Sequence, residues 1–197
     1  MLARESDSER IVNAFFRRQM ADYVEYHRDP WNCAMHVFGI ITLFLAAILP
    51  LTSLTVSVLG VHANMATLLA LPVLIYWFLL DRALGAGILV AALLLMVTAS
   101  AIDNHFSPAA VWSITAVLMI VGIASQIIGH QVFEQRQPAL MDNPTHLLLG
   151  PMFVMAKLYN TFGFRKDLAA ILQQGQQTSP TPSLYAEETQ GEPQPNS

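Results

Sequence analysis

Charged residues are absent from three long stretches of the chain, and this constrains the fold more than any other feature. Residues 33–80, 83–102 and 104–133 contain no Asp, Glu, Lys or Arg. Over the whole chain 12% of residues are charged and 54% are hydrophobic, whereas a soluble domain carries about 25% charged residues. The sequence therefore predicts a membrane protein.

A helix of about 20 mostly apolar residues crosses the hydrocarbon layer of a bilayer. Four segments approach this length, and we expect spans at residues 33–49, 65–80, 83–102 and 109–129. Residues 51–61, which follow a proline, could form a half-helix or a re-entrant segment. The expected fold is all-α: a multi-pass membrane helix bundle with about four transmembrane helices.

The basic residues orient these spans, because Lys and Arg accumulate in cytoplasmic loops. Arginines precede the first span, Arg82 separates the second from the third, and further basic residues follow the fourth. Residues 50–64 and 103–108, which form the other two loops, contain none. Both termini and the turn at Asp81-Arg82 should therefore face the cytoplasm.

Further helices are expected outside the spans. Residues 5–27 carry an apolar stripe among charges at helical spacing, which predicts an N-terminal amphipathic helix on the membrane surface. Residues 146–159 are apolar but too short to span, which favours an interfacial or re-entrant helix. A short helix is indicated over 164–173. Residues 174–197 are rich in Gln, Pro, Ser and Thr, and we expect a disordered polar tail there.

The predicted topology divides the six histidines into two groups. Two fall on the non-cytoplasmic side, where we expect solvated loop residues: His62 and His105. Four fall at or near the cytoplasmic ends of the spans, where a metal site could form: His27, His36, His130 and His146. Neutral imidazole binds iron, zinc, copper and nickel.

Two of these histidines flank a helix start. Asp29-Pro30 matches an N-cap followed by proline at the first helical position. On one unbroken helix His27 and His36 would lie on opposite faces, so the break is what allows both imidazoles to converge. Asn32 shares a helix face with His36; it could bind a substrate carboxylate, hold a ligand histidine, or only stabilise the first helical turn.

A second polar cluster follows the fourth span. His130 and Glu134 are four residues apart on a helix that should end near Gln137, because Pro138 cannot continue the hydrogen-bond pattern. Glu134 could bind a metal, could fix the tautomer of a ligand imidazole, or could be an exposed residue near a helix end. Asp142 could be a further ligand or simply part of a turn.

Both clusters resemble the 2-hydroxy fatty acid dioxygenases, a family first recognised in the fungal endoplasmic reticulum, with plant and bacterial relatives. The first block of the family pattern is matched by Tyr26, His27, Asn32 and His36. The second block is matched by Gln126, Gly129, His130, Phe133, Glu134, Pro138, Ala139, Leu140, Asp142 and Asn143, and the similarity continues at Pro151 and Phe153. It covers residues 22–159.

The resemblance implies an enzyme that uses Fe(2+) and O₂ to shorten 2-hydroxy long-chain fatty acids by one carbon, with release of CO₂. It implies metal ligands at His27, His36 and His130. Asn32 and Glu134 are then the candidate catalytic residues. Additional ligands or supporting residues would be Asp142, His146 and Gln126, although relatives can carry glutamine at the position of His146. Residues 1–173 would form one membrane-embedded catalytic domain.

Other function classes stay open at this point. A non-enzymatic lipid-binding or scaffold protein with structural histidines would hold no stoichiometric metal. Membrane hydroxylases and desaturases use closely spaced histidine clusters that this sequence lacks. A proton-coupled transporter is disfavoured, because no charged residue lies in the middle of a predicted span.

The expected partners are a 2-hydroxy fatty acid, O₂ and the lipid bilayer. A net charge of −4 without a basic aromatic patch gives no reason to expect nucleic acid. The expected location is the bacterial inner membrane, or the endoplasmic reticulum in a eukaryote, with the site on the cytoplasmic side. Oligomeric state is left open.

Overall fold

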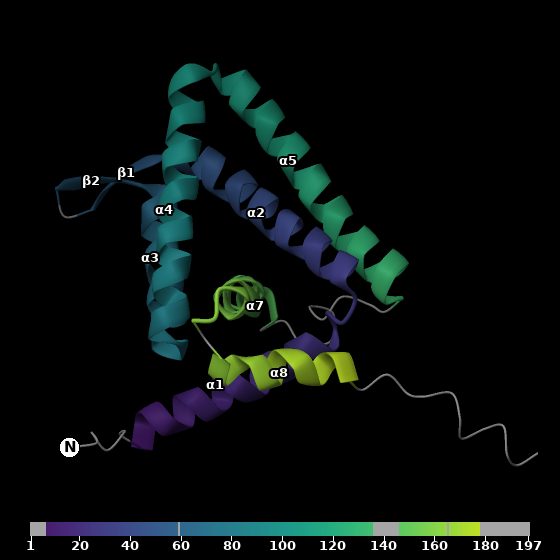
Figure 1. Cartoon of the computed structure of the whole chain (residues 1–197). Coiled ribbons are helices and arrows are strands. Elements are labelled where there is room, and N and C mark those ends of the chain that lie inside the picture. Colours follow the sequence, from purple (N-terminus) through teal and green to yellow (C-terminus); the bar gives the residue numbers. More distant parts are fainter. Residues whose placement is uncertain (1–6, 59, 136–145, 165, 178–197) are drawn as a thin grey trace, which may run out of the picture.

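The computed structural model describes residues 7–58, 60–135, 146–164 and 166–177 (Figure 1). Its elements, in chain order, are α1 (Asp7–Glu25), α2 (Pro30–Thr52), β1 (Thr55–Val58), β2 (Val61–Asn64), α3 (Met65–Leu80), α4 (Arg82–His105), α5 (Pro108–Ile128), η1 (Gly129–Glu134), α7 (His146–Thr161) and α8 (Lys166–Gln177). All are helices except one small hairpin, and the predicted all-α class is confirmed.

Three helical segments in the described part of the chain are long and apolar enough to cross a membrane: α2, α4, and α5 continued by η1. The fourth predicted span is α3, which has 16 residues and is shorter. Large apolar side chains point outward from these helices, including Val97 and Ile120, each 67% exposed. Long helices with apolar outer faces require lipid around them, so the chain is a multi-pass membrane protein.

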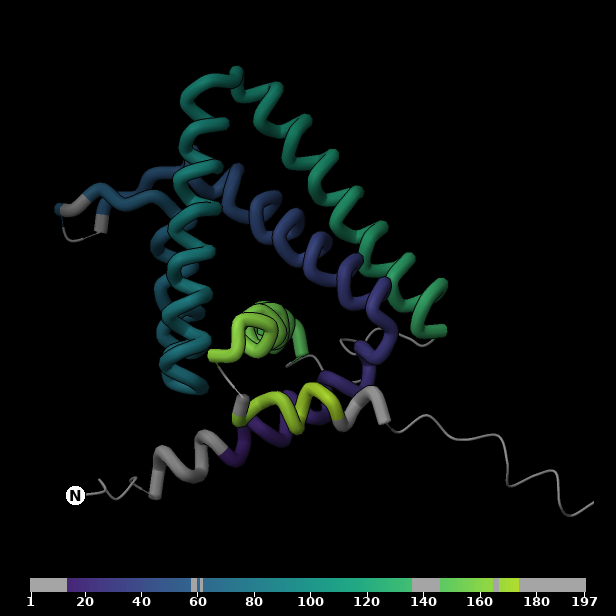
Figure 2. Tube along the Cα trace, in the orientation of Figure 1, coloured from purple at the N-terminus to yellow at the C-terminus, as the bar shows by residue number. Residues whose placement is uncertain are grey.

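The long helices form two pairs that diverge (Figure 1). Helix α2 packs along α5, and α3 packs along α4. Glycines permit the first pair to approach closely, because a Cβ on Gly122 would lie 2.6 Å from Leu43 Cγ. Helices α1 and α8 lie across one end of the bundle, and α7 enters between the two pairs, as the tube in Figure 2 shows.

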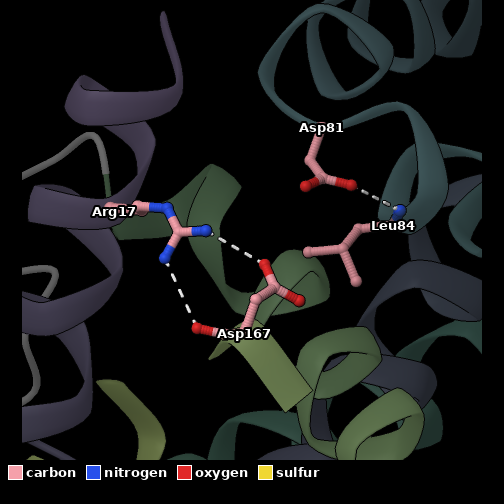
Figure 3. Close-up of polar contacts among 4 residues, drawn as sticks. All are labelled: Arg17, Asp81, Leu84 and Asp167. Carbon is pink, nitrogen blue, oxygen red and sulfur yellow. Dashed lines mark hydrogen bonds and ion pairs between the residues drawn. The ribbon is translucent and has the colours of Figure 1, made fainter. Parts of the chain in front are cut away.

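Capping aspartates begin two of the helices. The Asp29 side chain accepts hydrogen bonds from the backbone N–H groups of Trp31 and Asn32, which confirms the predicted start of α2. Asp81 accepts from the Leu84 N–H at 3.0 Å and caps α4 (Figure 3). The turn at Asp81 lies at the same end of the bundle as α1 and α8 (Figure 1), as the predicted topology requires.

The segment after α2 differs from the prediction. No half-helix or re-entrant segment covers residues 51–61 in the described residues; α2 continues through Pro50 to Thr52, and an antiparallel hairpin follows. Proline this close to a helix end removes only one late hydrogen bond. The β-branched residues that follow favour strands, and Gly60, with φ of 81°, forms the turn.

Two helix ends also differ from the prediction. The α5 segment ends at Glu134 rather than near Gln137, because its last residues widen into the π-helix η1 and Gln135 takes a left-handed conformation with φ of 52°. Helix α8 continues to Gln177, beyond the predicted boundary at residue 173. The rest of the predicted tail, residues 178–197, lies outside the described residues.

Helices α1, α7 and α8 share a buried core beneath the spans. It includes Phe16, Met20, Met152, Phe153 and Leu168, none more than 1% exposed. The predicted amphipathic helix at the N-terminus is confirmed as α1, and its apolar face packs on protein. An ion pair between Arg17 and Asp167, at 3.0 Å, joins α1 to α8 on the surface (Figure 3). The buried core formed by α1, α7 and α8 includes Tyr23, which contacts the histidines described below.

Candidate metal centre

Three histidines from separate segments meet at the end of the bundle beside α1. His27 lies in the turn after α1, His36 on α2 and His130 on η1. Each offers one ring nitrogen, and these three atoms all lie within 4.8 Å of one another. All three side chains are buried, with exposed fractions of 2%, 9% and 1%. The structure thus brings together the three predicted metal ligands.

A hydrogen bond to the backbone of α1 fixes the orientation of the His27 ring. Its Nδ1 lies 3.0 Å from the backbone carbonyl of Tyr23, and because a carbonyl can only accept, Nδ1 carries the proton. Nε2 therefore holds the lone pair and faces Nδ1 of His36 at 3.3 Å. Burial, and then the neighbouring His36, hold the pKa of His27 well below its usual range. A neutral imidazole is the form that binds a metal.

Tyr23 supports a second histidine. Its hydroxyl lies 2.5 Å from Nε2 of His36, which leaves Nδ1 of His36 to face the centre. Its ring also stacks on His27, with centroids 4.4 Å apart. Burial raises the pKa of Tyr23, so the phenol keeps its proton and can donate to His36 or accept from it.

The sequence prediction of the site did not include Tyr23. Its position four residues before His27 was the available signal, because that spacing puts two side chains on one helix face.

His130 sits at the start of the π-helix, a feature often found at functional sites. Its Nδ1 is buried and has no hydrogen-bond partner among the described residues. A buried ring nitrogen without a partner costs free energy, and a bound ligand would remove that cost. Gly129, the preceding residue, allows close approach, because a Cβ there would lie 2.6 Å from Oδ1 of Asn32.

Glu134 and Asn32 join the segments that carry the histidines. The Glu134 carboxylate accepts hydrogen bonds from the backbone N–H groups of Arg28 at 2.8 Å and Asp29 at 3.0 Å. Asn32 Nδ2 donates to the same carboxylate at 3.0 Å, and to the Tyr26 carbonyl at 3.2 Å. These contacts hold η1 against the turn that carries His27. A catalytic role for either residue stays a prediction.

The other candidates have varied positions. Gln126 Nε2 donates to the His36 carbonyl at 3.1 Å. His146 is buried beside Tyr23, but its Nε2 lies 3.0 Å from an Asp22 carboxylate oxygen, and it is not part of the three-histidine group.

Asp142 lies outside the described residues. The two histidines expected to be solvated, His62 and His105, are exposed.

A cavity of about 320 Å³ opens in front of the histidines. Its polar wall consists of the three histidines with Tyr23, Gln126 and His146, and its remaining wall is apolar: Ile40, Leu43, Phe44, Ile123, Ile127, Leu147 and Gly150. Such a cavity can hold a molecule with one polar end and a hydrocarbon body. Fold and site together define a class: a multi-pass membrane protein with a buried three-histidine centre facing an apolar cavity.

Comparison with known proteins gives the family. The chain belongs to the family described as 2-hydroxy-palmitic acid dioxygenase Mpo1-like, whose model matches residues 14–162. It is 30% identical over 158 residues to the 2-hydroxy-palmitic acid dioxygenase MPO1 of Saccharomyces cerevisiae, an alignment that covers 80% of this chain and 87% of the yeast protein. No solved structure matches. The predicted resemblance is confirmed, and the protein is an oxidoreductase of the dioxygenase class.

Proposed function

We propose that this protein is an Fe(2+)-dependent dioxygenase that converts 2-hydroxy long-chain fatty acids to the acid one carbon shorter. The reaction RCH(OH)COOH + O₂ → RCOOH + CO₂ + H₂O balances without a further reductant, because O₂ accepts all four electrons. The yeast relative is named for a 2-hydroxy acid of this kind. The observation that carries the proposal is the three-histidine group at the end of a largely apolar cavity.

The residues present fit a metal ion. His27 presents a neutral nitrogen, Nδ1 of His36 faces the same point, and His130 has a buried nitrogen without a partner among the described residues. His27, His36 and His130 would hold the ion. Zinc has no redox chemistry, so an oxygen-dependent reaction favours iron or copper among the metals that imidazoles bind. Iron would supply electron transfer between the substrate and O₂.

The protein's own contribution is to orient the substrate and to exclude water. The carboxyl and hydroxyl groups of the acid would lie against the polar wall, and its alkyl chain along Ile40 and Phe44. Fixing the acid in one orientation raises the effective concentration of the reacting groups. The buried position of His27 and His130, each at most 2% exposed, keeps bulk water from the reacting end.

We also place the site on the cytoplasmic side, most simply in a bacterial inner membrane, or in the endoplasmic reticulum in a eukaryotic host. The support is the positive-inside rule. Arg17, Arg28 and Lys157 belong to the segments around the histidine end of the bundle, and Arg82 is the first residue of α4, which begins at that same end (Figure 1).

The test is purification under anaerobic conditions, metal analysis, and incubation with 2-hydroxyhexadecanoic acid and O₂. We expect about one iron per chain and formation of pentadecanoic acid, CO₂ and water without 2-oxoglutarate or NADPH. Chelation should abolish turnover and Fe(2+) should restore it. Copper in place of iron, with full activity, would contradict the proposed metal; absence of pentadecanoic acid from the iron-loaded protein would contradict the proposed reaction.

A further inference from the structure

A second cavity lies farther along α2, away from the histidines. It has a volume of about 250 Å³ and lies among α2, α3, α4 and α7. Hydrophobic residues line it throughout, among them Leu51, Ala70, Ala91 and Met155. The reaction proposed above assigns this cavity no role.

The two cavities are adjacent, because Ile40 and Phe44 line both of them. Phe44 also packs against Trp77, with ring centroids 6.1 Å apart, on the side of the second cavity. Helix α7 comes close at the same place, since a Cβ on Gly150 would lie 2.8 Å from Ile40 Cδ1. Side chains at this junction therefore separate the space near the histidines from the second cavity.

Distances along α2 show that the first cavity alone is too short to hold a long alkyl chain. An α-helix rises about 1.5 Å per residue, so the stretch from His36 to Phe44 covers roughly 12 Å, and that from His36 to Leu51 roughly 22 Å. One lipid chain covers about half of a 30 Å hydrocarbon layer, roughly 15 Å. A long-chain acid with its polar end at the histidines extends past Phe44.

We propose that the second cavity binds the distal end of the substrate's alkyl chain, and that Ile40 and Phe44 mark the passage between the two cavities. The depth of the second cavity then sets the preference for long-chain acids. This inference rests on the proposed function, because the chain is placed by anchoring its carboxyl end at the histidines. Its occupant is the hydrocarbon tail of that acid, since the cavity adjoins the site at Ile40 and Phe44 and is lined by hydrophobic residues.

The test fills the second cavity from two helices. Ala91→Phe on α4 and Ala70→Phe on α3 both add a ring to the lining. Ala86→Phe is the matched control, because Ala86 is exposed on α4 and lines neither cavity. The measurement is kcat/KM for 2-hydroxyhexadecanoic acid divided by that for 2-hydroxyoctanoic acid, in detergent micelles or nanodiscs.

We expect this ratio to fall about tenfold or more in both filling variants and to stay at the wild-type value in Ala86→Phe. Loss of roughly two buried methylene groups is enough for that change. Retained turnover of the eight-carbon acid shows that a variant is folded with an intact site. An unchanged ratio in an active filling variant would overturn the proposal, as would an equal fall in the control.

A second measurement does not depend on turnover or on stable variants. A 2-hydroxy acid with a diazirine at the end of its alkyl chain is photolysed with the wild-type protein, and the labelled residues are mapped. We expect labelling of half-buried residues of the second cavity's lining, such as Leu74 or Met96, that excess 2-hydroxyhexadecanoic acid prevents. Labelling confined to outward-facing residues such as Leu94 and Ile120 would overturn the proposal. If the wild-type protein turns over neither acid, the proposed function is contradicted. The labelling experiment does not require turnover, so it still tests whether the second cavity binds the alkyl chain.

Discussion

The contacts within the helix bundle differ in kind between its two ends. At the histidine end, polar groups distant in sequence meet: Glu134 binds the backbone of residues 28 and 29, and Gln126 binds the His36 carbonyl. At the opposite end the buried contacts are mainly apolar, among Ile48, Leu49, Ala66, Ala99 and Val111. Apolar contact is non-directional, whereas hydrogen bonds fix orientation. The comparison indicates that polar contacts between distant segments are concentrated where the three histidines converge.

The sharpest way to test this contrast is to remove one histidine from each end. His130→Ala should abolish stoichiometric metal and lower turnover of a 2-hydroxy acid by more than about 100-fold, beyond the loss typical for a residue that only supports a ligand. His105→Ala, at the exposed end of α4, should leave both unchanged. Metal analysis and product formation measure the two effects. Equal turnover in both variants would refute the proposed centre.

Tyr23→Phe should have the next largest effect. It removes the hydroxyl that contacts His36 but keeps the ring that stacks on His27. Loss of such a supporting contact typically lowers metal affinity or activity by about 10- to 100-fold. Metal affinity measured by competition with a chelator checks this. Tyr76→Phe on α3 is the control, because the Tyr76 side chain lines neither cavity. A similar loss of metal affinity in Tyr76→Phe would argue against a specific role for Tyr23.

Glu134→Gln should have the smallest of the three effects, on stability more than on chemistry. The carboxylate accepts from three donors, and in the amide one of the two oxygens is replaced by an NH₂ group, which cannot accept a hydrogen bond. Hydrogen bonds to charged groups contribute about 1.5–3 kcal/mol each, so we expect a loss of about 2 kcal/mol in unfolding free energy. Thermal unfolding in detergent is the measurement.

Asp103→Asn at the opposite end is the control for that experiment. Asp103 accepts one hydrogen bond, from the Ser53 hydroxyl, and an amide oxygen can still accept it. A change within about 0.5 kcal/mol is expected, as for most surface substitutions. If both variants lose the same stability, the carboxylate at residue 134 has no special structural role.

Much of this centre could be predicted because its signals are local. The Asp29-Pro30 helix start implied that His27 and His36 could converge, and charge-free runs located the long helices. Tyr23 escaped prediction because a tyrosine in an apolar stripe looks like a packing residue until its tertiary partner is known. The contacts of Glu134 also could not be foreseen, since backbone groups more than a hundred positions away supply them.

The hairpin and the π-helix were not predicted from the sequence for another reason. The strands at residues 55–58 and 61–64 are too short to give a clear alternating pattern, and the pairing of β1 with β2 supplies partners for their backbone groups. The π-helix at Gly129–Glu134 could not be predicted either, because a π-helix is usually a single turn within an α-helix and the apolar spacing of the sequence continues through it.

The separation of the three histidines along the chain has a consequence for biosynthesis. His27 and His36 leave the ribosome early, while His130 follows only after α3, α4 and all of α5 have been made. The nascent protein therefore holds two of the three imidazoles and lacks the third until the last long helix has been synthesised. A metal centre that needs all three histidines, as proposed above, would therefore be completed late in maturation.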